Sequence, residues 1–383
     1  MRELEIYIHI PFCARKCAYC DFCSFDSLSE TERDRYVTAL VNEISAFADT
    51  ARDRAVRSVF FGGGTPSLLT EKQLTAIFSA LSHYNILSDA EISMEINPKT
   101  VDREKLEFIR GCGVNRLSIG MQSANDSELF MLGRLHSSED FLTCYHLARE
   151  VGFDNINVDI MTALPGQSIS DLEKTLDFAV SLAPEHISAY ILKIEENTPF
   201  AKRKIATPDE ELTADMYLYT CERLKNAGYS HYEISNFAKD GYRCVHNMGY
   251  WEGTDYLGFG VSASSLFDGN RYTHIRSLSD YIDFSDGEKT AEDYISSAKI
   301  TENEGESDEK YEYIMLSLRL SDGILLERAN ELFGFDFYLH FKDIIDRTVK
   351  AGLATLDGGR YFLTDRGMCV SSSVICEFLL RMS

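Results

Sequence analysis

The first half of the chain alternates short apolar runs with amphipathic stretches. Six runs rich in β-branched and aromatic residues predict strands, namely Ile6–Ile10, Val56–Phe61, Glu91–Ile96, Arg116–Met121, Asn155–Thr162 and His186–Ile194. Apolar residues at helical spacing predict helices over Thr31–Ala51, Glu71–Tyr84, Asp102–Gly111, Ser138–Val151 and Ser168–Leu182. This alternation predicts an α/β fold with parallel strands, either a partial (β/α)6 barrel or a doubly wound sheet. In both architectures ligands bind at the C-terminal ends of the strands.

The alternating pattern ends near residue 235. Residues 236–300 are rich in Tyr, Gly, Ser and Asp and lack clear periodicity, and Thr301–Lys310 has the acidic, small-residue composition of a solvated linker. The tail predicts helices over Tyr311–Leu320, Leu325–Phe333, Phe337–Ala351 and Ser371–Leu380, with a hairpin over Leu353–Leu363. Three helices followed by a β-wing resemble a winged-helix module. We therefore expect a core at 1–235, a connecting region at 236–300 and a winged-helix-like α+β domain at 301–383.

The net charge of the chain limits the classes of partner that it is expected to bind. The 383 residues carry a formal net charge of -23, with 44% hydrophobic and 26% charged residues, which is typical of a soluble globular protein. An acidic surface repels phosphate backbones and anionic lipids, so we expect neither nucleic-acid binding nor stable membrane insertion. The sequence shows no signal peptide and no apolar stretch of membrane-spanning length, and we expect a cytoplasmic protein.

The ten cysteines are distributed unevenly along the chain. In a reducing compartment clustered cysteines indicate metal binding or catalysis rather than disulfides. Cys13, Cys17 and Cys20 form a C-x3-C-x2-C motif just after the first predicted strand. Three thiolates on a short loop can hold three irons of a [4Fe–4S] cube and leave the fourth iron open. The other cysteines outside this loop are expected to be small buried hydrophobic residues, namely Cys112, Cys144, Cys221, Cys244, Cys369 and Cys376.

Two other ligand sets are conceivable for this loop. A structural zinc site takes four ligands in separated pairs, and the sequence has no second pair near this loop. Cys23 could serve as a fourth ligand, but it lies only three residues after Cys20 and would close the open iron. We expect Cys23 to be a non-ligand. An open iron is a substrate site, which in radical S-adenosylmethionine (SAM) proteins is chelated by the amino and carboxylate groups of SAM.

A glycine-rich segment, FFGGGTPS, follows the second predicted strand and includes Gly63, Gly64 and Thr65. Glycines let the backbone approach a ligand closely and expose its amide and carbonyl groups. A tight strand-to-helix turn would explain the glycines equally well. After a C-x3-C-x2-C strand, the segment resembles the glycine-rich segment that holds the SAM amino group in radical SAM proteins, and the Thr65 hydroxyl could add a contact.

Several polar residues stand on strands that are otherwise apolar. Glu95, Gln122 and Asp159 each require a polar partner if they are buried, which is either a ligand or a bridging water. Asp159 is suited to the hydroxyls of a ribose. Arg134, in the turn MLGR, could pair with the SAM carboxylate, although taken alone it would be a surface charge.

The successive segments IYIHIPFCARKCAYCDF, FFGGGTPS, SMEINP, NRLSIGMQS, NVDIMTALPGQ, SAYILKIEENTPF, YEISNFA, HNMGYW and YLGFG resemble a radical SAM family. This is the family of oxygen-independent coproporphyrinogen III oxidase and its heme-chaperone (HemW-type) branch. The tail resembles the C-terminal domain of the same family in FLTDRG. The resemblance implies a [4Fe–4S] cluster and a SAM pocket built from Tyr7, Tyr19, Gly63, Gly64, Thr65, Glu95, Gln122, Arg134 and Asp159.

Three features favour the chaperone branch over the oxidase. Cys13 follows only twelve residues, whereas the oxidase has a substantial segment ahead of its cluster loop. The oxidase has a further cysteine two residues after the third, where this chain has Phe22. The segment HNMGYW matches the H-N-x-x-Y-W signature of the chaperone branch. We expect a heme chaperone without coproporphyrinogen III dehydrogenase activity and assign no catalytic residue. The alternatives are that oxidase, which decarboxylates two propionates, and another radical SAM reaction such as methyl transfer.

His246 is the candidate heme ligand, because an imidazole can ligate heme iron and the neighbouring Tyr250 and Trp251 could stack on a porphyrin. His9 is its rival, and a structural role is the alternative for either histidine. The chain departs from the branch pattern at Ser262–Ser265 and at His274, where Asn is usual. The resemblance implies heme, a heme-acceptor protein such as one of the respiratory chain, and a small electron-donor protein as partners.

Overall fold

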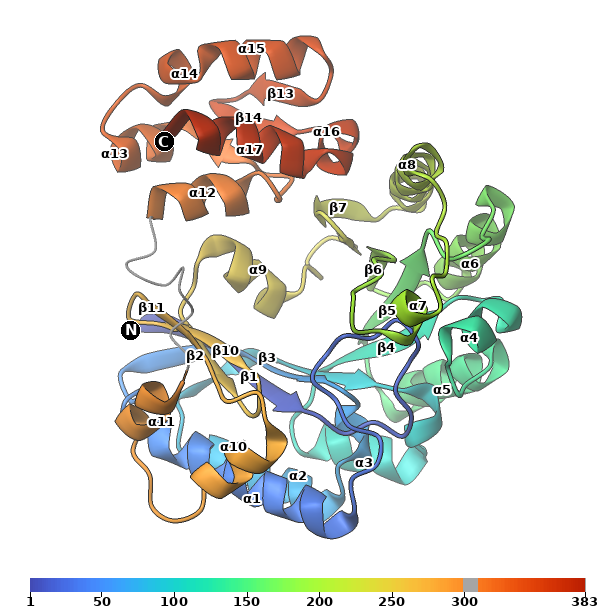
Figure 1. Ribbon diagram of the computed structural model, residues 1–383, viewed down its shortest axis with the longest axis vertical. Helices are drawn as coiled ribbons and strands as arrows, with labels where there is room; N and C mark the ends of the chain where they lie inside the picture. The colour runs from blue at the N-terminus through green and yellow to red at the C-terminus, as the bar shows by residue number, and fades with distance from the viewer. Residues whose placement is uncertain (299–308, 383) are drawn as a thin grey trace. The chain divides into compact units, whose positions relative to one another are not determined.

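The computed structural model describes residues 1–298 and 309–382 (Figure 1). The chain forms two compact units, which are described separately. The first contains the described residues of Met1–Met161, Leu192–Ala206 and Thr254–Glu306, and the second those of Thr162–Ile191, Thr207–Gly253 and Ser307–Ser383. Residues 301–308 of the expected linker lie outside the described residues. No described helix has the length and apolar character needed to cross a membrane.

The first unit is built on a sheet whose strands are mainly parallel. Its strands are β1 (Arg2–Ile10), β2 (Arg54–Gly63), β3 (Ile86–Ile96), β4 (Arg116–Gln122), β5 (Asn155–Thr162), β9 (Tyr256–Phe259), β10 (Ser264–Phe267) and β11 (Asn270–Thr273). They lie in the order β11-β10-β9-β1-β2-β3-β4-β5, with β9 and β1 to β5 parallel and β10 and β11 antiparallel. The parallel α/β arrangement expected from the hydrophobic pattern is confirmed.

The helices of the first unit begin at caps that the sequence supplies. Ser29 with Glu32, and Thr70 with Gln73, form capping boxes at the first two helices, so the exposed amides of each first turn are satisfied. The helices are α1 (Glu30–Phe47), α2 (Glu71–Leu81), α3 (Arg103–Gly111), α4 (Asp126–Leu132), α5 (Ser138–Val151), α7 (Pro199–Lys202), α10 (Leu278–Phe284) and α11 (Ala291–Ser297). Helix α1 buries Tyr36, Leu40 and Ile44, as its helical spacing predicts.

The described part of the connecting region, residues 236–298, is more regular than its composition suggested. It supplies β9, which pairs with β1, and the hairpin strands β10 and β11. Strand β9 has four residues and all are buried, so it shows no alternation by which it could be recognised. Close packing requires a glycine at position 258 in β9, because a Cβ on Gly258 would lie 2.2 Å from the Ser264 carbonyl oxygen.

The second unit contains two groups of antiparallel strands. The first has the order β6-β8-β7, with β6 at His186–Ile191, β8 at Asn236–Ala238 and β7 at Ser230–Glu233. The second has the order β12-β14-β13, with β12 at Ile324–Leu325, β13 at Ala354–Asp357 and β14 at Arg360–Leu363. The helices are α6 (Ile169–Ser181), α8 (Glu210–Asn226), α9 (Val245–Glu252), α12 (Glu309–Ser317), α13 (Leu326–Phe333), α14 (Phe337–His340), α15 (Lys342–Lys350), α16 (Asp365–Cys369) and α17 (Ser371–Met382). The C-terminal α+β domain is thereby confirmed.

One expected helix of that domain is interrupted. The continuous helix predicted over Phe337–Ala351 is two helices, α14 and α15, separated at Phe341, whose backbone has φ -102° and ψ 17°. The Phe341 ring is fully buried and packs against Phe337 and Phe378 at centroid distances of 4.6 and 5.1 Å. Periodicity predicted the apolar face, whereas the break follows from the tertiary packing of this ring.

A buried carboxylate holds the segment after β9 against α1. Glu43 of α1 is fully buried and accepts hydrogen bonds from the Gly260 amide at 2.8 Å and the Tyr281 hydroxyl at 2.6 Å. Nδ1 of His274 lies 3.0 Å from its other carboxylate oxygen. His274, one of the departures from the family pattern, therefore has a structural partner inside the first unit. Two donors on one oxygen of this buried carboxylate offset part of its desolvation.

We expect Glu43→Ala to lower the free energy of unfolding by about 3 kcal/mol, because two buried donors, the Gly260 amide and the Tyr281 hydroxyl, lose their acceptor. Urea unfolding of the anaerobic, cluster-loaded protein, followed by circular dichroism, would measure the loss. Tyr281→Phe is the matched control, since it removes one donor and should cost only about 1 kcal/mol. Equal losses in the two variants would show that Glu43 does not organise this segment.

Candidate metal centre

The loop that carries the three motif cysteines is fixed by backbone hydrogen bonds. It leaves β1 and closes on itself, since the Cys13 amide donates to the Phe25 carbonyl at 2.9 Å and the Phe25 amide to the Pro11 carbonyl at 2.7 Å. In the middle of the loop the Ala18 amide donates to the Leu132 carbonyl at 2.9 Å. The loop therefore holds its cysteines at the C-terminal end of β1, where parallel α/β folds bind ligands.

The three thiols of the motif form no disulfide, and polar side chains lie close to two of them. Cys13 is buried, and Cys17 and Cys20 are half-buried. The Thr65 hydroxyl lies 4.0 Å from the Cys13 sulfur, and Nη1 of Arg134 donates to the Cys17 sulfur at 3.6 Å. Burial raises the pKa of the Cys13 and Cys20 thiols, so cluster binding must displace their protons. A guanidinium beside Cys17 suits the charge of a thiolate-bound cluster.

Cys23 contacts different groups from the three motif cysteines. Its sulfur is 3.9 Å from the Arg276 carbonyl oxygen, and its own carbonyl accepts from Nε2 of His9 at 2.8 Å. Burial raises the pKa of its thiol. These contacts give Cys23 a structural role in the loop, and its absence from the cluster ligand set stays a prediction.

The glycine run at the end of β2 is required by close packing. A Cβ on Gly64 would lie 2.6 Å from the Phe12 carbonyl oxygen, and one on Gly62 would lie 3.0 Å from the Tyr7 ring. Gly63 has φ +111°, and its amide donates to Oε2 of Glu95 at 3.1 Å. The segment therefore brings β2 directly against the cysteine loop. Its role toward SAM remains a prediction.

Two carboxyl groups belong to the predicted pocket, and the charge of Asp159 acts on Glu95. Burial and the charge of Asp159 raise the pKa of Glu95 to about 8, although the hydrogen bond from the Gly63 amide acts in the opposite direction. Asp159 accepts hydrogen bonds from the Ser118 hydroxyl at 2.9 Å and from the Asn157 amide at 2.8 Å. A site with two acidic groups and a raised pKa favours a cationic ligand, and the SAM amino and sulfonium groups fit this requirement.

Arg134 and Gln122 complete the polar side of the site. Nη2 of Arg134 donates to the Gly120 carbonyl at 3.1 Å, and its Nε is buried without a hydrogen-bond partner among residues 1–298 and 309–382. Gln122 is buried at the end of β4, where the pairing with β5 shifts register, and has φ +67°. Strained backbone of this kind is concentrated at ligand sites. An unsatisfied guanidinium N–H fits a carboxylate ligand.

The predicted Tyr19 and Tyr7 stand beside these groups. Burial raises the pKa of the Tyr19 phenol, although Arg134 nearby acts in the opposite direction. The Tyr7 hydroxyl lies 3.0 Å from Nδ1 of His9. With the Cys23 carbonyl on Nε2, both ring nitrogens of His9 are engaged, and burial lowers the pKa of the ring. His9 would have to break one of these bonds before it could ligate heme iron.

His246 lies in the second unit, on α9. It is buried, and its Nε2 lies 3.0 Å from the hydroxyl of Tyr250, one helical turn later. The two rings meet edge-on at a centroid distance of 4.8 Å. Trp251 is half-buried, and the Arg319 guanidinium lies 5.9 Å from its ring centroid. The His246 and Tyr250 rings are thus packed together on one short helix, which also carries Trp251.

The cysteines outside the loop differ more than expected. Cys144, Cys221 and Cys244 are buried, whereas Cys112 and Cys369 are half-buried and Cys376 is exposed. The expectation of a buried hydrophobic role is wrong for Cys376, which projects outward from α17. Cys221 is buried but lies beside His231 and Asp365. Sequence reasoning did not find this group, because its members are far apart in the chain.

Comparison with known proteins gives the class of the chain first. The Radical SAM superfamily model matches residues 7–179, and the HemN C-terminal domain model matches residues 307–370. The fold and the cysteine loop define a radical SAM protein, a class that implies a [4Fe–4S] cluster and SAM. The structure of coproporphyrinogen III oxidase (HemN) from Escherichia coli superimposes with a TM-score of 0.82 over 98% of this chain and 89% of that chain. At 24% identity, this likeness shows the fold.

Sequence relatives identify the family within that class. Heme chaperone HemW of Bacillus subtilis is 35% identical over 97% of this chain and 98% of its own length. The protein of that name from Lactococcus lactis is 31% identical over 98% and 97%, and the one from E. coli is 40% identical over 68% and 69%. The chain belongs to the HemW family of radical SAM proteins.

Replacing single cysteines would test the ligand set. Anaerobically reconstituted wild-type protein should contain about four irons and four sulfides per chain. Cys13→Ala, Cys17→Ala and Cys20→Ala should each lose the cluster, because a three-thiolate cube tolerates no missing ligand. Cys23→Ala is the matched control and should keep it. Iron and sulfide analysis gives the result, and loss of iron in Cys23→Ala would make Cys23 a ligand.

The raised pKa of Glu95 predicts a pH-dependent stability. The carboxyl has a pKa of about 8 in the folded protein against an ordinary value of 4.5. Between these values the folded protein keeps a proton that the unfolded chain releases, so stability falls as pH rises from 4.5 toward 8.

Glu95→Gln should remove this part of the pH dependence in SAM-free protein, which urea unfolding at several pH values would measure. The exposed Glu252→Gln is the control and should leave the slope unchanged. If the unfolding free energy of Glu95→Gln depended on pH as steeply as that of the wild type, the proton retained by the folded protein would belong to another group.

Proposed function

We propose that this protein is a heme chaperone that binds heme and passes it to an acceptor protein. The observation that carries the proposal is the 35% identity to a heme chaperone HemW along 97% of this chain and 98% of that protein. The likeness extends through both units and includes the region of the HNMGYW motif. A family relationship over the whole chain supports a shared function better than fold alone does.

Within this proposal the first unit holds the cluster and SAM. Cys13, Cys17 and Cys20 ligate the cluster. Glu95 and Asp159 attract the cationic groups of SAM, and Arg134 pairs with its carboxylate through the N–H that lacks a partner among the described residues. Tyr7, Tyr19, Gly63, Gly64, Thr65 and Gln122 line the same pocket. Bound together, cluster and SAM supply reductive cleavage of a SAM carbon–sulfur bond.

Heme binding is proposed at α9 in the second unit. His246 offers an imidazole, and Tyr250 and Trp251 offer aromatic faces to the macrocycle. Iron ligation at Nε2 must displace the Tyr250 hydroxyl, which lies 3.0 Å from that nitrogen. Arg319, beside Trp251, provides a cation for a heme propionate. His246 is preferred over His9, because Tyr250 and Trp251 on the same helix offer aromatic faces to the macrocycle.

Two variants with opposite effects would test the heme ligand. We expect the wild type to bind about one heme per chain, and His246→Ala to shift or weaken the Soret band because one Fe–N bond is lost. Residual affinity should remain, since burial of the macrocycle does not depend on the ligand. Tyr250→Phe should strengthen binding by about two- to tenfold, because it removes the hydroxyl that competes for Nε2. Heme titrations followed by absorbance measure all three.

The exposed His83→Ala serves as the control for loss of a histidine and should bind heme like the wild type. Unchanged spectra in His246→Ala would show that another residue ligates the heme iron, and His9→Ala would be the next variant to test. The same protein, incubated anaerobically with coproporphyrinogen III, SAM and a reductant, should form no protoporphyrinogen. Formation at a catalytic rate would replace the chaperone proposal by the oxidase.

A further inference from the structure

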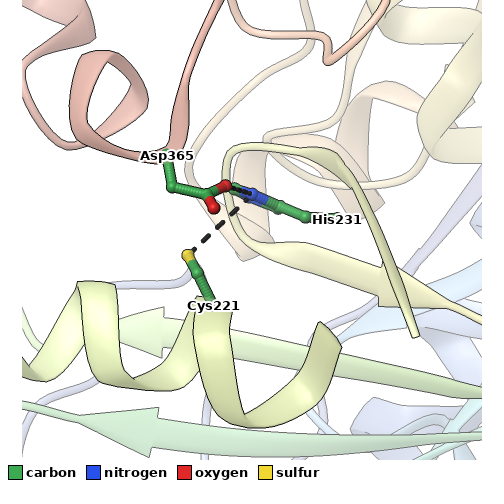
Figure 2. A group of neighbouring side chains, drawn as sticks. All are labelled: Cys221, His231 and Asp365. Atoms are coloured by element: carbon green, nitrogen blue, oxygen red, sulfur yellow. Dashed lines mark hydrogen bonds and ion pairs between the residues drawn. The ribbon is translucent and has the colours of Figure 1, made fainter. Parts of the chain in front are cut away.

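Three potential metal ligands from separate segments of the second unit converge on one point (Figure 2). Cys221 lies on α8, His231 on β7 and Asp365 at the first residue of α16. The Cys221 sulfur is 3.9 Å from Nδ1 of His231, and that nitrogen is 3.0 Å from Oδ1 of Asp365. Across residues 1–298 and 309–382, this is the one group of three such ligand atoms that all lie within 4.8 Å of one another.

The distances are close to those of a tetrahedral zinc site. Zinc–ligand bonds of about 2.0–2.3 Å at tetrahedral angles separate a sulfur from a nitrogen by about 3.5 Å and a nitrogen from an oxygen by about 3.4 Å. A proton relay has a different geometry, because its two partners occupy opposite ring nitrogens of the histidine. Here the thiol and the carboxylate face the same nitrogen, as ligands of a shared cation do.

The surroundings of His231 hold its ring in the orientation that ligation requires. The ring stacks on Phe237 with centroids 4.4 Å apart and an interplanar angle of 15°. Nε2 lies 3.5 Å from the Tyr217 hydroxyl, which donates to the Ile234 carbonyl at 3.1 Å. With a cation on Nδ1, the ring proton would reside on Nε2 and point to the Tyr217 oxygen. A hydrogen-bonded second nitrogen is the usual arrangement for a metal-bound histidine.

We propose that Cys221, His231 and Asp365 bind one divalent cation of the zinc class. A thiolate, an imidazole and a carboxylate are the ligands that zinc takes, whereas magnesium and calcium prefer oxygen alone. The fourth position would be filled by water or by Cys369, one helical turn after Asp365 on α16. The cation would replace the thiol proton of Cys221, which is almost fully buried.

The site would join parts of the second unit that are distant in sequence. Cys221 and His231 belong to the segment Thr207–Gly253, whereas Asp365 belongs to the C-terminal domain. Oδ1 of Asp365 already lies 3.0 Å from Nδ1 of His231, so a carboxylate oxygen is in place to share a cation with that nitrogen. A bound cation would therefore add a cross-link between α8, β7 and α16 that depends on zinc and is independent of heme and of the cluster.

The test uses full-length, cluster-loaded protein exposed to zinc chloride and then desalted. We expect about one zinc per chain in addition to the cluster iron, by metal analysis. The full chain with Cys13→Ser, Cys17→Ser and Cys20→Ser, in which the cluster cysteines cannot take the metal, should also retain one zinc. In that background cobalt(II) should give a thiolate charge-transfer band, which reports a bound sulfur directly.

Cys221→Ser and Asp365→Asn should each abolish stoichiometric zinc and the rise in melting temperature that zinc causes. Asp365 is partly exposed, with 43% of its side chain accessible, so its isosteric variant keeps the fold testable if Cys221→Ser unfolds. Cys144→Ser, a buried helical cysteine of the first unit, is the matched control and should bind zinc normally. Less than stoichiometric zinc in the wild type, or full binding in Asp365→Asn, would overturn the proposal.

Discussion

The candidate site depends on the close parallel contact between the ends of β1 and β2. The Gly64 amide donates to the Ile10 carbonyl at 2.8 Å, and a side chain at Gly64 would collide with the Phe12 backbone. This contact sets the cysteine loop against the glycine run, and the Gly63 amide in turn binds Glu95 on β3. The loop is closed from the other side by the Leu132 carbonyl near Arg134. The cysteine loop can therefore approach the end of β2 closely because glycines there leave no side chain in the way.

The sequence predicted the parts of the fold that are periodic and the parts of the site that are local. The parallel strands and their helices followed from apolar spacing, and the cysteine loop followed from C-x3-C-x2-C at the end of a strand. It could not predict β9, since four buried residues carry no alternation. The break at Phe341 and the buried Glu43 were missed for a related reason, because both depend on partners distant in the chain.

The same distinction applies to the chemistry of individual residues. Glu95 and Asp159 could be identified as polar residues on apolar strands, but the effect of Asp159 on the pKa of Glu95 depends on how the folded sheet places β3 and β5. The left-handed backbone of Gln122 and the buried Nε of Arg134 are likewise properties of the folded chain. Cys221 had a sound local interpretation as a buried hydrophobic residue. Only folding shows that His231 and Asp365 share its environment.

Metal preference follows from how each group of ligands is built. Three thiolates on one loop suit the separate irons of a cube and leave one iron open to SAM. Cys221, His231 and Asp365 approach one another within 4.8 Å, a spacing that suits one ion and is too narrow for a cube. Their mixed sulfur, nitrogen and oxygen donors favour zinc over an iron–sulfur cluster. If both proposals hold, the two metal sites of one chain differ in ligand type and in spacing. The iron–sulfur cluster and zinc would then not compete for the same ligands.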